Sequence, residues 1–322
     1  MNADHGAAAL RQRLAARAAL HARIRAFFAA RAVLEVETPI LSAAANTDPN
    51  IASFATRYSG PAQAGAAARW LRTSPEYALK RLLAAGSGDC FELGRVFRDG
   101  EYGRHHNPEF TLLEWYRIGW DAHRLADEVV ALLQDVLNAC GRSASVQVTT
   151  YAALFEQALG VDAHRDDIER LRAVLAADVD AAGLQRDDWL DLLLSHRIQP
   201  ALPPGRITVV HDYPASQCAL ARVRAGDPPL AERFEVYLGS QELANGYHEL
   251  ADAAEQRRRF EADNARRRAR GLPLLPPDEH LLAVLDALPD CSGVALGVDR
   301  LLQAVLDAPT IAATLAFDFA QA

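Results

Sequence analysis

Strand-like segments lie at both ends of the chain, and a long helical stretch separates them. Residues 89–117 have the pattern of two strands joined by a turn-rich loop, residues 206–214 and 233–250 that of three more strands, and residues 291–307 that of a strand, a tight turn and a helix. Residues 122–200 carry the apolar spacing of helices. This order predicts one antiparallel β-sheet flanked by helices, an α+β fold.

The chain length bears on how many domains to expect. The 322 residues are many for one core but fit one large domain that carries an insertion. We therefore interpret residues 1–322 as a single domain and the stretch at about 122–200 as its helical insertion.

Helix and strand punctuation predicts several further elements. We expect a helix at 8–31, a strand at 33–41 that Pro39 confines to an edge, a loop at 42–70 and an Arg-rich helix at 251–270. The loop has room for a short strand near its middle.

Residues 73–88 carry clear helix boundaries. Ser74 is a good N-cap, Pro75 suits the first helical position, and Gly86 can close the end.

Composition and charge exclude some classes of protein. The net charge of −8 argues against a nucleic-acid surface spread over the whole molecule, and no apolar run reaches membrane-spanning length. The four cysteines have no metal-site spacing, so we interpret them as thiols in a reducing, cytoplasmic setting. The N-terminus lacks the apolar core of a signal peptide.

The strand at 109–116 mixes polar and apolar residues on both of its faces. By the two-residue repeat, Phe110, Glu114 and Tyr116 share one face, and Thr111 and Trp115 lie on the other. A strand with one solvated face sorts its residues better than this. The carboxylate of Glu114 between two aromatic residues is therefore a candidate for function.

Three clusters carry residues suited to chemistry, and the first is FRDGEYGRHHNPEF, residues 97–110. An arginine at a strand end, followed by a loop with two glycines and a further arginine, can grip a polyphosphate because the guanidinium fork matches phosphate oxygens. The alternative is a solvated hairpin tip.

The second cluster lies in ERFEVYLGSQELANGYHEL. Glu235 and Glu242 occupy strands joined by a short Gly-Ser turn, so their carboxylates can meet. Two close carboxylates suit Mg²⁺, which prefers oxygen ligands. An exposed strand face explains the same pattern, and the residues alone do not decide between the two.

The third cluster is GVALGVDRLL. Arg300 stands in the first turn of the expected helix, where the helix dipole disfavours a cation, and Asp299 is expected to cap that helix. A residue that breaks a local rule is a candidate for function, here an anion contact. The alternative is a salt bridge to Asp299 or a nearby carboxylate.

Taken together, these clusters resemble the signature motifs of class II aminoacyl-tRNA synthetases. VLEVETPIL resembles motif 1, FRDGEYGRHHNPEFTLLEWY motif 2 and GVALGVDRLL motif 3, in the family's order and across residues 25–302. TSPEYALKRLL and ELANGYHEL are similar to the lysine-specific branch. The resemblance implies the class II catalytic core, an antiparallel sheet flanked by helices, and a homodimer through motif 1.

One absence points to a subgroup of that family. Motif 1 begins within the first forty residues, so we expect no anticodon-binding domain before it, and tRNA is not the expected partner. With TSPEY, YPASQ and PDCSGVALGVDR, the chain resembles the lysyl-tRNA synthetase paralogues that attach (R)-β-lysine to a lysine of elongation factor P.

The resemblance also implies roles for individual residues. For ATP, Arg98 contacts the α-phosphate, Asn107 the adenine edge and Phe110 the adenine face, while Gly297 allows close approach and Arg300 covers the phosphates. The further positions implied for ATP are Asp99, Gly100, Glu242 and Leu243. Glu235 and Glu242 are implied as the ligands of Mg²⁺.

The amino-acid substrate, (R)-β-lysine or lysine, is a diamine and needs two anions, because an unpaired buried ammonium is costly. Glu76 and Glu249 are implied for that role. The full set implied for this substrate is Ser74, Glu76, Glu114, Tyr116, Asn245, Tyr247, Glu249 and Ala295.

These roles imply an ATP-dependent, AMP-forming ligase with Arg98 and Arg300 as its catalytic arginines. The substrate carboxylate attacks the α-phosphorus, and the resulting adenylate acylates an ε-amine of elongation factor P. The alternatives are a truncated lysyl-tRNA synthetase that uses α-lysine, an inactive paralogue that acts as a regulatory subunit, and a dimeric structural protein.

The chain departs from the family pattern at two positions. Motif 2 normally has an acidic residue two positions after its arginine, and here that position is Gly100, so Asp99 or Glu101 would have to replace it. Ala295 stands where lysyl-tRNA synthetases usually have glycine, and we expect its methyl group to favour β-lysine over α-lysine.

Overall fold

The computed structural model describes residues 3–175, 179–181 and 183–322 and divides into two compact units. The first unit comprises Met1–Gly119, Leu250–Cys291 and Ala295–Ala322, and the second Trp120–Glu249 and Ser292–Val294. The predicted fold class, an α+β fold with a large, mainly antiparallel sheet flanked by helices, is confirmed. The predicted single domain with an insertion at 122–200 stays a prediction.

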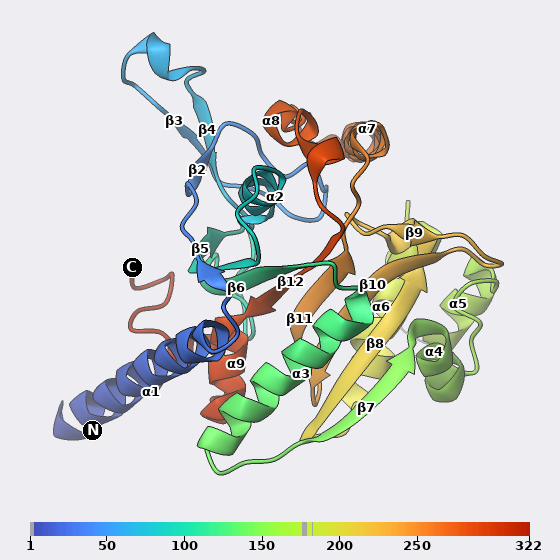
Figure 1. The fold of residues 1–322 in the computed structure, drawn as a ribbon. Helices are drawn as coiled ribbons and strands as arrows, with labels where there is room; N and C mark the ends of the chain where they lie inside the picture. The colour runs from blue at the N-terminus through green and yellow to red at the C-terminus, as the bar shows by residue number, and fades with distance from the viewer. Residues whose placement is uncertain (1–2, 176–178, 182) are drawn as a thin grey trace. The chain divides into compact units, whose positions relative to one another are not determined.

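The first unit contains most of the predicted motif segments (Figure 1). Its helices are α1 (Ala3–Ala29), α2 (Glu76–Ala84), α7 (Ala253–Ala269), α8 (Glu279–Leu282) and α9 (Val298–Val305). Its strands are β1 (Leu34–Glu35), β2 (Leu41–Ser42), β3 (Ala55–Arg57), β4 (Ala68–Leu71), β5 (Cys90–Phe97) and β6 (Glu109–Ile118), with the two ends of β12 (Cys291–Gly297). Short 3-10 helices lie at Ala62–Ala64, Leu285–Ala287 and Ile311–Thr314.

The predicted hairpin forms the centre of the first unit. β5 and β6 pair antiparallel from Cys90 with Tyr116 to Phe97 with Glu109. β1 adds to β5 in parallel, and β2, β4 and β3 make a separate three-stranded sheet.

Both faces of β6 are buried, which explains its mixed pattern. On one face Trp115 packs edge-on against Phe28 of α1, with ring centroids 5.3 Å apart, and Phe28 stacks on Phe91 at 4.6 Å. On the other face Glu114 and Tyr116 are each only 2% exposed. The two faces therefore bury an aromatic cluster and a carboxylate.

The second unit contains helices α3 (Ala122–Ala139), α4 (Tyr151–Leu159), α5 (Ile168–Leu175) and α6 (Arg186–Leu193), followed by a π-helical turn at Leu194–Ile198. Its strands are β7 (Ser145–Thr150), β8 (Arg206–Pro214), β9 (Val223–Arg224), β10 (Leu230–Leu238) and β11 (Gln241–His248). Short 3-10 helices lie at Gln199–Ala201 and Ala215–Gln217.

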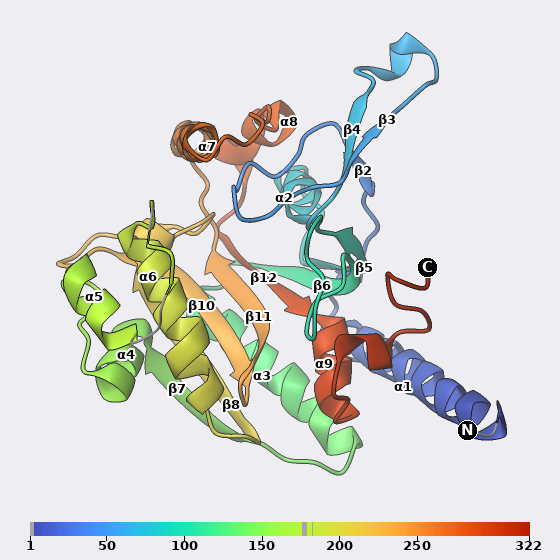
Figure 2. The ribbon, with the colours of Figure 1, turned by 180° about the vertical axis from the view of Figure 1, so that it is seen from behind.

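Helices cover both faces of the second unit's strands, which run in the order β11, β10, β8, β7, with β9 beside β10. The views in Figure 1 and Figure 2 place α3 on one face and α6 on the other. The core on the α6 side gathers Tyr151, Trp189, Tyr213 and Tyr237. This core surrounds the part of β10 that carries Glu235.

The predicted helix α2 is present, but it begins one residue later than expected, at Glu76, with Pro75 and not Ser74 as its N-cap. Ser74 Oγ accepts a hydrogen bond from the Glu76 backbone N–H at 2.9 Å, and Pro75 directly precedes the helix. Gly86 follows the helix with φ of 89°, a conformation that glycine adopts without strain. The helix therefore ends where its sequence signal stands.

One element prediction is wrong, and a second one is incomplete. Residues 33–41 form only the two-residue strands β1 and β2, because Pro39 has no N–H and the Thr38 carbonyl accepts from Arg72 instead of a neighbouring strand. Residues 122–200 are mostly helical, as predicted, but they also include strand β7, which pairs in parallel with β8 over six residues.

Among the described residues, none of the helices combines the length and the apolar character that crossing a bilayer requires.

Candidate active site

The carboxylate of Glu114 is held by two hydroxyl groups. Ser74 Oγ donates to Glu114 Oε2 at 2.6 Å, and Tyr116 Oη donates to Oε1 at 2.8 Å. Ser74 reaches this position because it lies just before the start of α2, and Tyr116 because it lies two residues further along the same strand face. The three residues predicted together for substrate are therefore brought together.

A cavity of 150 Å³ in the first unit lies beside this cluster. Ser74 and Glu76 line it, together with Arg72, Asp278 and His280. The Glu76 carboxylate accepts from Lys80 Nζ at 2.6 Å, one turn along α2. Lys80 is only 2% exposed and is the sole lysine of the sequence. Glu76 is thus an anion that already has an ammonium partner, which the sequence reading missed although the i,i+4 spacing signals it.

Arg98 lies at the end of β5 with its guanidinium 5.1 Å from the centroid of the Phe110 ring. Its Nη1 is 3.5 Å from Glu101 Oε1. Its Nε is buried and donates no hydrogen bond to any described residue. A buried guanidinium N–H without an acceptor fits an anionic oxygen from a ligand.

The missing acidic residue of motif 2 has a structural explanation. Gly100 has φ of 81°, which glycine adopts and side-chain-bearing residues rarely do. Glu101 faces Arg98, whereas Asp99 is exposed and bonds through its backbone N–H to the Ala52 carbonyl at 2.9 Å. Of the two replacements considered, Glu101 is the one that contacts the arginine.

Asn107 is buried and bonds to backbone groups. Its Nδ2 donates to the Glu109 carbonyl at 2.6 Å, and its Oδ1 accepts from the Phe319 N–H at 3.1 Å. The amide predicted at the adenine edge therefore also ties the C-terminal segment to the start of β6.

Arg300 does not pair with Asp299, so the salt-bridge alternative to Asp299 is wrong. The N-cap of α9 is Gly297, and Asp299 inside the helix binds Arg17 at 2.5 Å and the Thr111 N–H at 2.8 Å. Arg300 Nη2 lies instead 2.7 Å from His106 Nε2.

His106 is kept neutral by its surroundings. Burial, and then the charge of Arg300, lower the pKa of His106 below its ordinary value. A neutral imidazole next to Arg300 is compatible with an arginine that reaches for an anion.

Gly297 and Ala295 share the half-buried face of β12, while Leu296 and Val298 are buried. A Cβ added at Gly297 would lie 3.6 Å from Arg300 Cδ, within ordinary contact. Glycine at this position thus leaves the space beside the Arg300 stem open.

The second unit carries the remaining predicted residues on β10 and β11. Glu235 Oε1 accepts from Arg233 Nη2 at 2.5 Å, and Oε2 accepts from the Tyr237 hydroxyl. Burial, followed by the charge of Glu235, raises the pKa of Tyr237 well above its ordinary value, so the phenol stays protonated and donates. The Arg233 partner was not foreseen from the sequence.

A β-bulge sets which residues of β11 share this face. Glu235 stands opposite Asn245, but Tyr237 stands opposite Glu242, so one residue, Leu243, is extra on β11. Without the bulge, alternation would put Glu242 and Asn245 on opposite faces. The two predicted magnesium ligands therefore do lie on the same face.

Asn245 Nδ2 donates to the Tyr247 hydroxyl at 2.9 Å. Asn245 Oδ1 is buried and accepts no hydrogen bond from the described residues. An amide oxygen in that condition fits a cation or an ammonium group. Glu249, 1% exposed, follows directly after β11.

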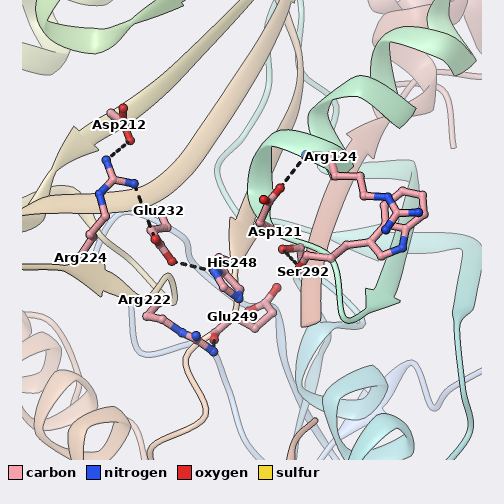
Figure 3. A network of polar contacts seen from close by, with 10 residues as sticks. Asp121, Arg124, Asp212, Arg222, Arg224, Glu232, His248, Glu249 and Ser292 are labelled. Atoms are coloured by element: carbon pink, nitrogen blue, oxygen red, sulfur yellow. Dashed lines mark hydrogen bonds and ion pairs between the residues drawn. The ribbon is translucent and has the colours of Figure 1, made fainter. Parts of the chain in front are cut away.

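A network of polar contacts surrounds this end of the second unit (Figure 3). Arg224 bridges Asp212 and Glu232, and His248 Nδ1 lies 2.7 Å from Glu232 Oε2. Arg222 reaches the Glu249 carbonyl at 3.5 Å. The proximity of His211 and of Arg224 lowers the pKa of Asp212 to about 2. Among these residues, the sequence analysis assigned a role only to Glu249.

Comparisons with known proteins show the family of this chain. Residues 3–321 match the family model for class II tRNA synthetases of the D, K and N type. The chain is 49% identical to a Vibrio cholerae protein named elongation factor P–(R)-β-lysine ligase, over all of this chain and 99% of that one.

Two enterobacterial proteins of the same name are equally similar. The identity is 50% to the Klebsiella pneumoniae protein and 49% to the Salmonella paratyphi B protein, over 94% of this chain and 93% of each relative. The chain therefore belongs to the class II tRNA synthetase family of the D, K and N type, among relatives named as elongation factor P–(R)-β-lysine ligases.

Proposed function

We propose that this chain uses ATP to activate (R)-β-lysine as an aminoacyl-adenylate and transfers it to a lysine ε-amine of elongation factor P. The names of relatives at about half identity and nearly full coverage support this reading. The observation that carries it is the Glu114 carboxylate fixed between Ser74 and Tyr116 on the floor of β6. A buried, prepositioned carboxylate suits the ammonium group of an amino acid.

The first step needs no general base from the protein. The substrate carboxylate is already ionised and attacks the α-phosphorus in line, so a P–O bond forms while the bond to pyrophosphate breaks. Negative charge builds on the phosphate oxygens. The protein's task is therefore to position the reactants and stabilise that charge.

Arg98 and Arg300 are the groups for this task. The Nε of Arg98 lacks a protein acceptor, which fits an α-phosphate oxygen, and its contact with Phe110 sets the guanidinium beside the proposed adenine platform. Arg300 projects past the open backbone of Gly297. Both arginines are therefore assigned to phosphate oxygens.

The donor set on β10 and β11 fits Mg²⁺. Glu242 shares its strand face with Glu235, and all of these donors are oxygens. Bound Mg²⁺ would neutralise phosphate charge. Glu235 Oε1 already accepts a hydrogen bond from Arg233, so Glu235 would share this oxygen between Mg²⁺ and the guanidinium.

The diamine substrate is assigned to carboxylates of α2, β6 and the end of β11. Glu114 and Tyr116 position the amino acid, and Glu76 and Glu249 serve its two ammonium groups. Asn245 offers its buried Oδ1 as a neutral acceptor, beside Tyr247. Lys80 competes for Glu76, which lowers the negative charge that this carboxylate presents.

In the second step the ε-amine of the acceptor lysine attacks the adenylate carbonyl and AMP leaves. The amine must be neutral to attack, so it must lose a proton before or during the step.

We further propose a cytoplasmic homodimer. Four free thiols and three exposed apolar side chains in the motif 1 segment support it, namely Leu34, Ile40 and Leu41 at 55%, 40% and 53% exposure. Apolar residues at such exposure are favourable to bury in an interface.

The test is intact-mass analysis of purified elongation factor P after incubation with the enzyme, ATP, Mg²⁺ and either (R)-β-lysine or α-lysine. We expect a gain of one lysyl unit, larger with the β isomer. Arg98→Gln should abolish the gain. Arg95→Gln, which removes an exposed arginine from the same strand, is the matched control and should leave it intact.

Other outcomes separate the alternatives. ATP–pyrophosphate exchange without modification of elongation factor P would point to a different acceptor, such as tRNA. If the wild type shows neither pyrophosphate exchange nor modification of elongation factor P, the result would favour the regulatory subunit. If Ala295→Gly prefers the β isomer to the same degree as the wild type does, Ala295 has no role in selectivity.

A further inference from the structure

A second cavity, of 210 Å³, lies in the second unit between helix α3 and the strands β8 and β10. Phe234 lines it, so it lies on the face of β10 opposite to Glu235 and Tyr237, because neighbouring residues of a strand point to opposite faces. The cavity is therefore separate from the carboxylates proposed for Mg²⁺. Its wall carries residues to which the proposed reaction gives no role.

Three of these residues converge on one point. His123 on α3 and His211 and Asp212 on β8 each offer a ligand atom, and these atoms all lie within 4.8 Å of one another. The rings of His123 and His211 meet edge to face with centroids 4.7 Å apart. Ligands at roughly 2.0–2.1 Å from a tetrahedral Zn²⁺ stand about 3.3 Å from each other, so a small adjustment closes this triangle around a metal.

We propose that His123, His211 and Asp212 form a binding site for a transition metal ion of the zinc class, which ties α3 to β8.

The contacts of His211 support the site. Its Nδ1 lies 3.0 Å from Asp212 Oδ2, yet this buried nitrogen lacks hydrogen-bond geometry with every described residue. Two ligand atoms that face each other at this separation are placed to bind a third atom between them.

The contacts of Asp212 support it as well. Arg224 Nη2 donates to Oδ1 at 2.9 Å (Figure 3), and the other oxygen, Oδ2, lies 3.0 Å from His211 Nδ1. Such a hydrogen bond to the far oxygen orients a ligating carboxylate. Asp212 also has φ of 59°, a conformation that costs energy outside glycine and clusters at ligand sites.

The donor set selects the class of metal. Two imidazoles and one carboxylate suit Zn²⁺, whereas Mg²⁺ prefers oxygen ligands alone. His123 is exposed, so an ion can enter and water can complete the coordination. The competing explanation is an ion pair between protonated His211 and Asp212, which needs neither His123 nor a metal.

The experiment is equilibrium dialysis of the chelator-stripped full-length chain against Zn²⁺ in excess Mg²⁺, which occupies oxygen-only sites. Bound zinc is measured by elemental mass spectrometry, and Co²⁺ serves as a second probe through its visible spectrum. We expect one zinc per chain, absorption bands of tetrahedral cobalt with nitrogen ligands, and a higher melting temperature with zinc.

His123→Ala decides the question because the residue is exposed and alanine favours a helix, so this variant keeps its fold. It should weaken zinc binding by about tenfold or more and lose the cobalt bands. Asp127→Asn removes a carboxylate one turn further along α3 in the same cavity, and it should change the affinity less than twofold, that is, by less than about 0.4 kcal/mol.

Two results would overturn the proposal. Unchanged zinc binding in His123→Ala would assign the zinc to other groups, such as the cysteines, which this variant retains. An equal loss in Asp127→Asn would show that the charge of the cavity, not the three ligands, holds the ion. Neither result bears on the ligase activity, which is measured separately by modification of elongation factor P.

Discussion

The molecule contains the same short arrangement twice, once in each unit, with different partners. On β6, Glu114 is followed two residues later by Tyr116, whose hydroxyl donates to it. On β10, Glu235 is followed two residues later by Tyr237, whose hydroxyl also donates to it. The other donor is the Ser74 hydroxyl in the first case and the Arg233 guanidinium in the second.

This difference separates two uses of a buried carboxylate. Hydroxyl donors orient a carboxylate without contributing a positive charge of their own, which suits a carboxylate that serves a cationic ligand. A guanidinium donor both orients the carboxylate and cancels its charge, so removal of either partner leaves a buried charge behind. We therefore expect changes at Glu114 to act on the substrate and changes at Glu235 to act first on the fold.

The largest expected effect is on stability. Glu235→Gln should lower the free energy of unfolding by about 3 kcal/mol, because the Arg233 guanidinium loses its countercharge. The midpoint of urea unfolding measures it.

The double variant Arg233→Met, Glu235→Gln should recover most of that loss, because no charge is then buried alone. If Glu235→Gln is as stable as Glu114→Gln, the contrast between the two carboxylates is wrong.

The second effect is on activity. Glu114→Gln should reduce kcat/KM for the lysine substrate in ATP–pyrophosphate exchange by about 100-fold, which corresponds to about 2.7 kcal/mol for the loss of an ammonium partner.

In the same variant, KM for ATP should change little, and the unfolding midpoint should fall by less than it does in Glu235→Gln. A loss confined to ATP binding would place Glu114 with the nucleotide instead.

The paired tyrosines sharpen the comparison at smaller scale. Tyr116→Phe removes one of the two hydroxyls on Glu114 and should destabilise the protein by about 2 kcal/mol, as for a hydrogen bond to a charged group. Tyr237→Phe should lower the free energy of unfolding by about 1 kcal/mol less than Tyr116→Phe does, because Arg233 still donates a hydrogen bond to Glu235. Denaturant unfolding of both variants measures the difference, and equal costs would mean that the guanidinium adds nothing.

The smallest expected effect depends on pH. The pKa of His106 is lowered below 6.5 by burial and then by Arg300, with smaller influences from Glu101, His105 and Arg98. As the pH falls below 6.5, the unfolded chain binds this proton before the folded one does, so stability falls with decreasing pH. Protonation finally places a cation against Arg300.

Adenylate formation should therefore decline on the acid side in the wild type and less in His106→Asn, which stays neutral. The pH profile of pyrophosphate exchange tests this expectation. Identical acid limbs would show that another group controls them.

The sequence predicted the elements that carry strong local signals. Helix α2, the hairpin of β5 and β6 and the turn between β10 and β11 all follow from residues close in sequence. The strand at 33–41 was wrong because a side chain distant in sequence, Arg72, takes the Thr38 carbonyl. The parallel partner of β7 is likewise distant in sequence, so it left no local signal.

The candidate site divides in the same way. Residue patterns and the family resemblance suggested the candidate groups, but not their partners. Three contacts became visible only in the folded structure. Glu101 pairs with Arg98, Lys80 with Glu76, and Arg233 with Glu235. The bulge at Leu243 also could not be predicted from the two-residue repeat of a strand, because one extra residue moves the preceding residues of β11 to the opposite face.

The state of Lys80 has a chemical consequence. An aminoacyl-adenylate is a mixed anhydride that reacts with accessible neutral amines, and an enzyme's own lysine side chains compete with the intended acceptor. This chain has one ε-amine, which is buried and bound to a carboxylate. The proposed enzyme is therefore a poor target for its own product, and self-acylation is suppressed by the near absence of a nucleophile.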